Sequence, residues 1–84
     1  MKPFRLLVDL EVIDFINTLP RTQRVKLRDS LLAIQQHPAH SSDYEERDAE
    51  GRTVAIHISG KFAIKFWVDH ADKHIKVLDI HSAD

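Results

Sequence analysis

The sequence predicts an α+β fold in which a two-helix hairpin packs on a small, mainly antiparallel β-sheet. Three apolar runs rich in β-branched and aromatic residues follow one another at the C-terminal end, at residues 53–59, 62–68 and 74–81. Because the spacers between them are too short for a crossover helix, these strands must pair antiparallel as a meander. The preceding residues carry helical periodicity instead, which places the helices before the main part of the sheet.

The N-terminal half predicts one strand and two helices. Residues 4–8 (FRLLV) are apolar enough for a first strand, and Asp9 follows as an N-cap for a short helix. Pro20 separates this helix from the next, because proline disfavours helical geometry in the preceding residue and fits a first helical turn. The second helix is expected over about residues 20–36 and ends before another proline. The short link between the helices predicts an antiparallel hairpin.

Alternation along the strands predicts which side chains share a face of the sheet. A charged stretch at residues 44–48 (YEERD) is expected to form an edge strand before the meander. The apolar set expected to face the helices comprises Val54, Ile56, Ile58, Phe62, Ile64, Phe66 and Val68. The opposite face is expected to carry His57, Lys65 and Trp67, a combination of cations and an aromatic ring that suits single-stranded nucleic acid.

Composition limits the class of protein. The 84 residues are expected to form one domain, 1–84, whose small core makes a binding partner matter for stability. The absence of cysteine excludes disulfides and thiolate chemistry and agrees with an expected cytoplasmic location. The N-terminal apolar stretch is too short and too charged for a signal peptide or a membrane span. Twelve Lys and Arg oppose thirteen Asp and Glu, so any nucleic-acid surface must be local.

Two stretches carry a resemblance to a known family. They are LPRTQRVKLRDSLLAIQQHP at residues 19–38, and the hairpin at Gly60 followed by FAIKFWVDH and IKVLDIH. With the order of elements, they make the chain resemble the RelE/ParE superfamily of type II toxin–antitoxin toxins, which includes plasmid-stabilisation proteins. The resemblance implies two helices on a small antiparallel sheet and a cognate antitoxin as partner. It also implies that a toxin, or a toxin-derived protein, inhibits growth through messenger RNA cleavage on the ribosome or through a protein target such as gyrase.

The basic positions usual in this family are not matched here. Members commonly carry an arginine two positions after the hairpin glycine, where this chain has Phe62, and another after the last strand, where it has IHSAD at residues 80–84. The enzymatic question therefore stays open between a ribonuclease and a toxin that acts by binding. A third alternative is a non-toxic protein-interaction module on the same fold. The open edge strands of such a sheet suit an antitoxin segment or a homo-oligomer.

Ribonucleolytic attack by a 2′-hydroxyl needs proton transfer, and it needs cations that stabilise the charged phosphorane. His81 is the leading candidate for proton transfer, because imidazole exchanges protons near neutral pH and because the resemblance places it near a functional C-terminal position. Asp79 and Asp84 lie close to it in the sequence and are candidates to orient or charge its imidazole. The supporting cations are expected to be Lys61, Arg52 and Lys65.

Several further groups have alternative interpretations. His57 is the next candidate for proton transfer if His81 fails. Positions 21, 24 and 28 place arginines on one helical face, which suits phosphates, an acidic protein segment or an ordinary solvated surface. His70 and His74 have the spacing of helical metal ligands, but they flank a turn and no third ligand is evident, so neither a metal nor a cofactor is expected. For the polar residues of the sheet, a solvated face remains the alternative to a catalytic site.

Overall fold

The computed structural model describes residues 4–83 and confirms the α+β fold. In chain order the elements are β1 (Arg5–Val8), α1 (Leu10–Asn17), α2 (Arg21–Gln36), β2 (Tyr44–Arg47), β3 (Thr53–Ser59), β4 (Phe62–Asp69) and β5 (His74–Ser82). The five strands form one sheet in the order β1-β5-β4-β3-β2. Strand β1 runs parallel to β5, and all other neighbouring strands are antiparallel, so the C-terminal meander is confirmed.

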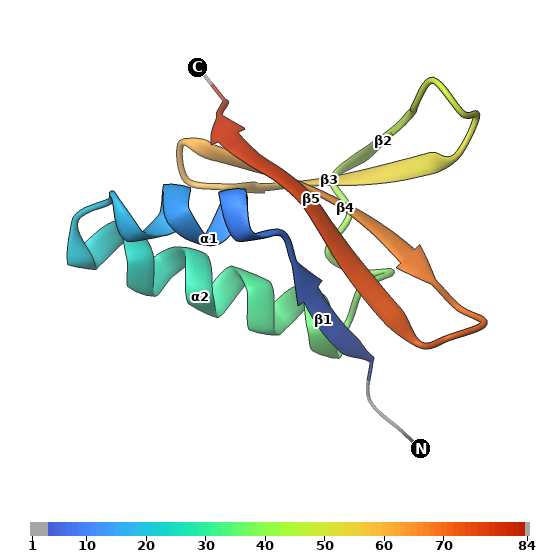
Figure 1. Ribbon diagram of the computed structural model, residues 1–84, viewed down its shortest axis with the longest axis horizontal. Coiled ribbons are helices and arrows are strands. Elements are labelled where there is room, and N and C mark those ends of the chain that lie inside the picture. Colours follow the sequence, from blue (N-terminus) through green and yellow to red (C-terminus); the bar gives the residue numbers. More distant parts are fainter. Residues whose placement is uncertain (1–3, 84) are drawn as a thin grey trace.

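Both helices lie on the same side of the sheet (Figure 1). The parallel pairing of β1 with β5 brings the first and last strands together at one edge of the sheet, while β2 forms the other edge, as expected from its charge. The face of the sheet that turns away from the helices is called the open face below. Within residues 4–83, no helix is long and apolar enough to cross a membrane.

Local sequence signals set the ends of the helices. Asp9 is the N-cap of α1, and its backbone carbonyl accepts hydrogen bonds from two N–H groups of the first turn at 3.0 and 3.1 Å. Its carboxylate makes no capping hydrogen bond, so only the position of the predicted cap is confirmed. Pro20 is the N-cap of α2, and His37 ends that helix with a non-helical φ of −140°. The predicted break between the helices and the end before Pro38 are therefore both present.

The main core lies between the helix pair and the sheet. Its buried members come from α1, α2, β4 and β5: Val12, Leu27, Leu31, Ile34, Phe62, Ile64, Phe66, Ile75, Val77 and Ile80. Leu27, Ile34 and Phe66 are completely buried. Phe15 of α1 meets Phe62 of β4 edge to face, with ring centroids 5.9 Å apart. The removal of these large apolar side chains from water is the main force that holds the helices on the sheet.

The facing predicted for β3 is wrong, whereas that for β4 is confirmed. Ala55 lies opposite Phe66 and packs against the main core, so the odd-numbered residues of β3 face the helices. Val54 and Ile56 instead face the open side, where they form a second cluster of buried side chains with Ala63.

Hydrogen bonds explain this orientation of β3. The hydroxyl oxygens of Ser30 and Ser59 lie 2.6 Å apart, and Nδ1 of His57 lies 2.7 Å from the backbone carbonyl oxygen of Ser41. Ser30 belongs to α2, and Ser41 lies in the loop that follows it, so polar residues of β3 find partners on the helix side. Because buried polar groups must be hydrogen-bonded, these partners offset the cost of placing His57 and Ser59 there.

Candidate functional site

The open face combines an apolar floor with charged side chains around it. Val54, Ile56 and Ala63 are each 2% exposed, and Leu78 packs against them. No helix covers this floor, so it is buried by the longer side chains of the neighbouring strands. Those side chains provide the chemistry of the face. They are Glu46 of β2, Arg52 just before β3, Lys65 and Trp67 of β4, and Lys76, Asp79 and His81 of β5.

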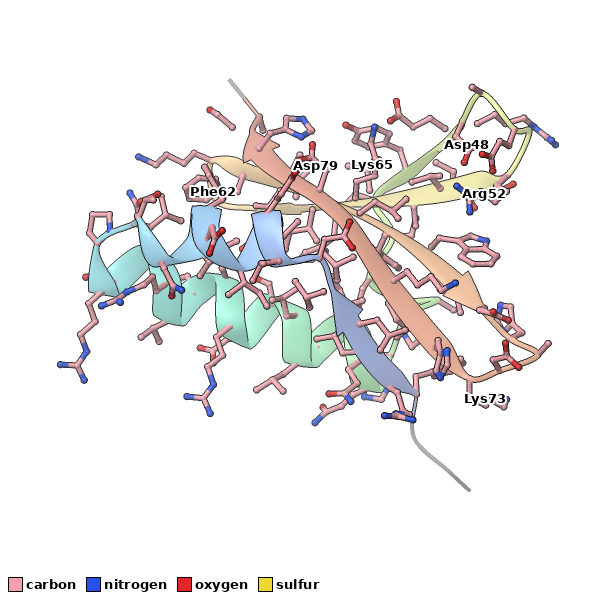
Figure 2. All side chains as sticks on the ribbon, viewed as in Figure 1. Asp48, Arg52, Phe62, Lys65, Lys73 and Asp79 are labelled. Atoms are coloured by element: carbon pink, nitrogen blue, oxygen red, sulfur yellow. The ribbon has the colours of Figure 1, made fainter. Side chains whose placement is uncertain are left out.

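A β-bulge in β5 determines which residues of this strand reach the open face. Lys65 is paired with Asp79 and Phe66 with Val77, which leaves Leu78 as an extra residue between them. The bulge shifts the alternation of the strand by one residue. Lys76, an even-numbered residue before the bulge, therefore shares the open face with the odd-numbered Asp79 and His81 after it. Figure 2 shows Asp79 close to Lys65.

His81 forms a dyad with Asp79. The two residues are separated by one position on β5, and Nδ1 of His81 lies 2.8 Å from Oδ2 of Asp79. About half of each side chain is exposed, so a ligand can reach the dyad. A carboxylate beside Nδ1 fixes the orientation of the imidazole ring. The sequence-based suggestion that Asp79 orients His81 thus has a structural basis, while Asp84 lies outside the described residues.

Lys65 lies in the middle of the face between two carboxylates. Its Nζ atom is 2.9 Å from Oε1 of Glu46, which reaches across β3 from the edge strand. The hydrogen bond to Glu46 raises the pKa of Lys65; partial desolvation acts in the opposite sense, and the charges of Glu46 and Asp79 add to the rise. Lys65 therefore remains a cation across the neutral pH range and can stabilise negative charge but not accept a proton.

Arg52 is held by the turn that joins β2 to β3. Oδ1 of Asp48 accepts hydrogen bonds from the backbone N–H groups of Glu50 and Arg52 at 3.0 and 2.9 Å, and Oδ2 accepts one from Nε of Arg52 at 2.8 Å. Oε2 of Glu50 lies 3.4 Å from the same Nε. Gly51 adopts a φ of +82° in this turn, a left-handed conformation that glycine favours. Asp48 and Arg52 are visible together beside the β2–β3 turn in Figure 2.

The ion pair shifts both pKa values in this turn. Partial burial acts to raise the pKa of Asp48, but the hydrogen bonds from Arg52 and Glu50 outweigh it and hold the pKa below its ordinary value of 3.8. The hydrogen bond to Asp48 raises the pKa of Arg52 further above its ordinary value. Both groups are therefore charged throughout the neutral pH range.

Replacing Asp48 with asparagine tests this turn through its pH dependence. Asparagine keeps an oxygen for the two backbone N–H groups but loses the charge that pairs with Arg52. Because the folded-state pKa of Asp48 is lowered, its contribution to stability is present above about pH 3.8 and is lost as the pH falls through the folded-state value. We expect the wild type to be more stable than Asp48→Asn at pH 6, and the difference to vanish in acid. Urea unfolding at a series of pH values measures it; a difference that grows toward low pH would contradict the assignment.

Trp67 lies between two cations at the β2–β3 end of the open face. The guanidinium carbon of Arg52 is 5.1 Å from the centroid of its ring, and Nζ of Lys76 is 4.9 Å from it. Lys76 is directly opposite Trp67 in the pairing of β4 with β5. These distances are within the range of cation–π attraction, which fixes the ring and both cations relative to one another.

The open face thus brings together three of the four candidate residues from the sequence: His81, Lys65 and Arg52. Lys61 lies apart from them, in the turn between β3 and β4, where its Nζ is 5.9 Å from the ring centroid of Phe62. It borders a hollow that it shares with Gln23 and Lys26 of α2. We therefore place Lys61 with the helix side of the molecule.

His57 is not on the open face, contrary to the prediction from the sequence. It is opposite Ile64 on the side of the helices, and its Nδ1 is engaged by the carbonyl of Ser41. The arginines of α2 at positions 21, 24 and 28 are exposed and lie outside the sheet surface. Among the described residues, no group of three His, Cys, Asp or Glu side chains is arranged to hold a metal ion.

Lys76 and Glu46 are site residues that the sequence-based prediction did not include. Strict alternation along β5 places Lys76 on the same face as His74 and on the opposite face from Asp79 and His81. Only the bulge at Leu78 unites them. The acidic character of β2 is visible in the sequence, but the reach of Glu46 to Lys65 depends on the order of the strands.

The architecture of two helices on one side of a five-stranded, mainly antiparallel sheet defines a class of small α+β folds. No protein-family model matches the sequence, and no curated protein matches it either. Among solved structures, RelE in the RelE–RelB complex from Pyrococcus horikoshii has a TM-score of 0.80 at 16% identity, with 98% of this chain and 97% of that chain covered. The RelBE2 toxin–antitoxin complex from Mycobacterium tuberculosis has a TM-score of 0.81 at 10% identity, with coverage of 96% and 99%.

A third similar structure is a double arginine-to-alanine mutant of the E. coli toxin RelE in the free state. It has a TM-score of 0.68 at 13% identity, with 99% of this chain and 86% of that chain covered. The likeness in all three cases extends over nearly the whole of this chain, although the sequences are very different. The resemblance to the RelE/ParE superfamily is therefore confirmed at the level of the fold.

Proposed function

We propose that this chain is the toxin of a type II toxin–antitoxin system, which acts in the cytoplasm and is neutralised by a cognate antitoxin protein. The observation that carries the proposal is the match, over 98% of this chain and 97% of the other, to a RelE toxin seen in complex with RelB. This match extends over nearly the whole of both chains. Function on a shared fold depends on the site, so the open face carries the mechanistic part of the proposal.

An antitoxin partner is supported by apolar side chains on the outer surface of the chain. Leu10 is 72% exposed at the start of α1, and Ile13, Val25 and Leu32 are exposed on the two helices. The edge strand β1 has a neighbour on one side only, and its Leu7 is exposed on the face away from the helices, since Leu6 and Val8 pack against the main core. In the proposal an apolar segment of the antitoxin covers the exposed helix side chains, and the open edge of β1 offers it a further contact, which would offset the small core of an 84-residue chain.

For the mechanism we propose cleavage of RNA on the open face. The 2′-oxygen of a ribose attacks the adjacent phosphorus, the bond from phosphorus to the 5′-oxygen breaks, and a cyclic phosphate forms. The 2′-hydroxyl gives up one proton, and the departing 5′-oxygen receives one. His81 is suited to one of these transfers, and the carboxylate of Glu46 beside Lys65 to the other. Lys65 supplies positive charge for the phosphorane. Arg52, beside Trp67 toward the other end of β4, adds positive charge along the path of the RNA.

A second mechanism, inhibition of a protein target such as gyrase, is favoured by the carboxylates on the same face. Glu46 neutralises Lys65, and Asp48 with Glu50 neutralises Arg52, which weakens attraction to a polyanion. A non-toxic interaction module on this fold is a third possibility. Each of the three makes a different prediction for a cell that produces the chain alone.

Induction of the chain alone in a bacterial host distinguishes these possibilities. We expect growth arrest with a fall in translation and cleavage of messenger RNA, while DNA supercoiling stays unchanged. Relaxed or altered supercoiling with intact messenger RNA would contradict RNA cleavage and support the protein target. Normal growth with soluble, folded protein would contradict the toxin proposal altogether.

The antitoxin contact is tested with Leu10→Glu. Because Leu10 is largely exposed, its replacement is expected to change the stability of the free chain by less than about 0.5 kcal/mol. We expect the variant to arrest growth like the wild type but to be rescued less well by co-production of the cognate antitoxin. Size-exclusion chromatography of the two purified proteins, and of the chain alone to detect a homo-oligomer, measures the contact. Equal rescue and equal complex formation would show that the antitoxin binds elsewhere.

A further inference from the structure

Among the described residues of the open face, one basic side chain has no carboxylate partner, so its charge is available to a ligand. Lys65, Arg52 and His81 each have a carboxylate within 3 Å. Lys76 is different: within the described part of the chain, no carboxylate lies within 4 Å of its ammonium group, and its contact is the ring of Trp67. An ammonium group packed on an aromatic ring keeps its full charge and its hydrogen-bond donors for an incoming anion.

Arg52, on the other side of Trp67, keeps donors as well. Both of its carboxylate partners contact the Nε atom. The two terminal nitrogens make no hydrogen bond to any described residue. Its side chain is 40% exposed, and the Asp48 turn fixes its direction. Arginine in such a fixed orientation can give a phosphate two parallel hydrogen bonds.

Trp67 determines the separation of the two cations. Since each lies about 5 Å from the ring centroid, they are at most 10.0 Å apart, the sum of 5.1 and 4.9 Å. The ring is half-buried on β4 and is paired with Lys76 through the backbone of β5, so neither cation can drift from the other without breaking a ring contact. The three residues are called the Trp67 cradle.

We propose that the Trp67 cradle is a second binding subsite of the open face, which holds a phosphate of single-stranded RNA away from the reacting phosphate at His81. This inference rests on the proposed RNA cleavage. The cradle and the His81–Asp79 dyad lie toward opposite ends of β4 and β5. Trp67 is paired with Lys76 near one end of these strands, and Ala63 is paired with His81 near the other. A strand of RNA lying along the sheet would meet both. The combination of cations and an aromatic side chain favours nucleic acid over an acidic protein segment.

Trp67 is the only tryptophan of the chain, so its fluorescence reports on the cradle directly. The experiment uses the full chain carrying His81→Ala, which is expected to slow cleavage, and titrates it with a single-stranded oligouridylate of about ten nucleotides. We expect RNA to change the Trp67 emission. Replacing Lys76 with glutamine should reduce the slope of log affinity against log salt by about 0.7, the value for one phosphate contact on a single strand.

Lys73→Gln is the matched control for Lys76→Gln. Lys73 also packs on an aromatic ring, with its Nζ 5.2 Å from the centroid of Phe4, but it lies in the β4–β5 turn, outside the cradle (Figure 2). Both variants remove one positive charge, so a difference between them cannot come from net charge. The proposal is overturned if the two variants have the same affinity and salt slope.

Two other outcomes also overturn the cradle and separate it from the proposed function. If RNA binds but the Trp67 emission stays constant, the contact lies elsewhere and RNA cleavage by the dyad is unaffected. If RNA does not bind and an aspartate-rich peptide changes the emission instead, the cradle takes an acidic protein segment. Growth arrest and messenger cleavage, measured independently, then decide whether the toxin proposal itself holds.

Discussion

Replacing Phe66 with alanine is expected to lower the free energy of unfolding by about 3 to 5 kcal/mol. The side chain is completely buried on β4, in the main core between the sheet and both helices. The loss combines the transfer of a large aromatic group with the cavity that remains, because neighbouring elements relax only in part. Since small domains are stable by about 5 to 15 kcal/mol, the variant is expected to be near the limit of folding at 37 °C. Urea unfolding followed by circular dichroism measures the change.

Two isoleucines of β3 provide the matched comparison. Ile56 and Ile58 occupy the same face of the same strand, but they are 2% and 38% exposed. Ile56→Ala is therefore expected to cost about 2 to 5 kcal/mol, whereas Ile58→Ala is expected to cost about 1 kcal/mol. Equal losses at the two positions, or a loss below about 1 kcal/mol for Phe66→Ala, would contradict the described packing.

The topology of the meander could be predicted because it depends on local features. The spacers after Ser59 and Asp69 are short, so no parallel connection can form, and Pro20 separates two helical patterns. The parallel pairing of β1 with β5 is a different matter. It joins residues from opposite ends of the chain, and no local signal in the sequence specifies it.

The orientation of β3 could not be derived from its own residues. Alternation separates Val54 and Ile56 from Ala55 and His57, but it does not say which set meets the helices. The partners that decide the matter, among them Ser41, are far away in the sequence. The prediction also assumed that apolar side chains are buried on the helix side of the sheet alone. In the structure a second buried apolar cluster lies on the open face.

The candidate site was predicted in part for the same reason. Lys65 was assigned to its correct face because β4 alternates regularly. Lys76 and His81 have opposite parity on β5, so regular alternation would place them on opposite faces. The unpaired residue Leu78 brings them to the same face. A bulge of this kind has no sequence signature in the chain, and it is the feature that assembles the open face.

Replacing His81 with alanine is expected to lower the rate of messenger RNA cleavage by about 10² to 10⁴, the usual contribution of a proton-transfer group. The side chain is half exposed, so the melting temperature should change little. Lys61→Ala is expected to have a smaller effect, because this lysine lies in the β3–β4 turn on the helix side, apart from the open face. Cleavage of a defined messenger by purified protein, with thermal unfolding in parallel, measures both.

Asp79→Asn separates an orienting role for Asp79 from a structural one. Asparagine can still hydrogen-bond Nδ1 of His81 but removes the negative charge beside the ring, so the rate of cleavage should fall while the melting temperature stays unchanged. An unchanged rate would show that the charge of Asp79 has no part in cleavage. His57 does not replace His81 as the candidate for proton transfer, because it lies on the helix side of the sheet, where its Nδ1 contacts the backbone carbonyl of Ser41. If His81→Ala retains full cleavage, the proton-transfer group must be a carboxylate of the open face, and Glu46→Gln becomes the deciding variant.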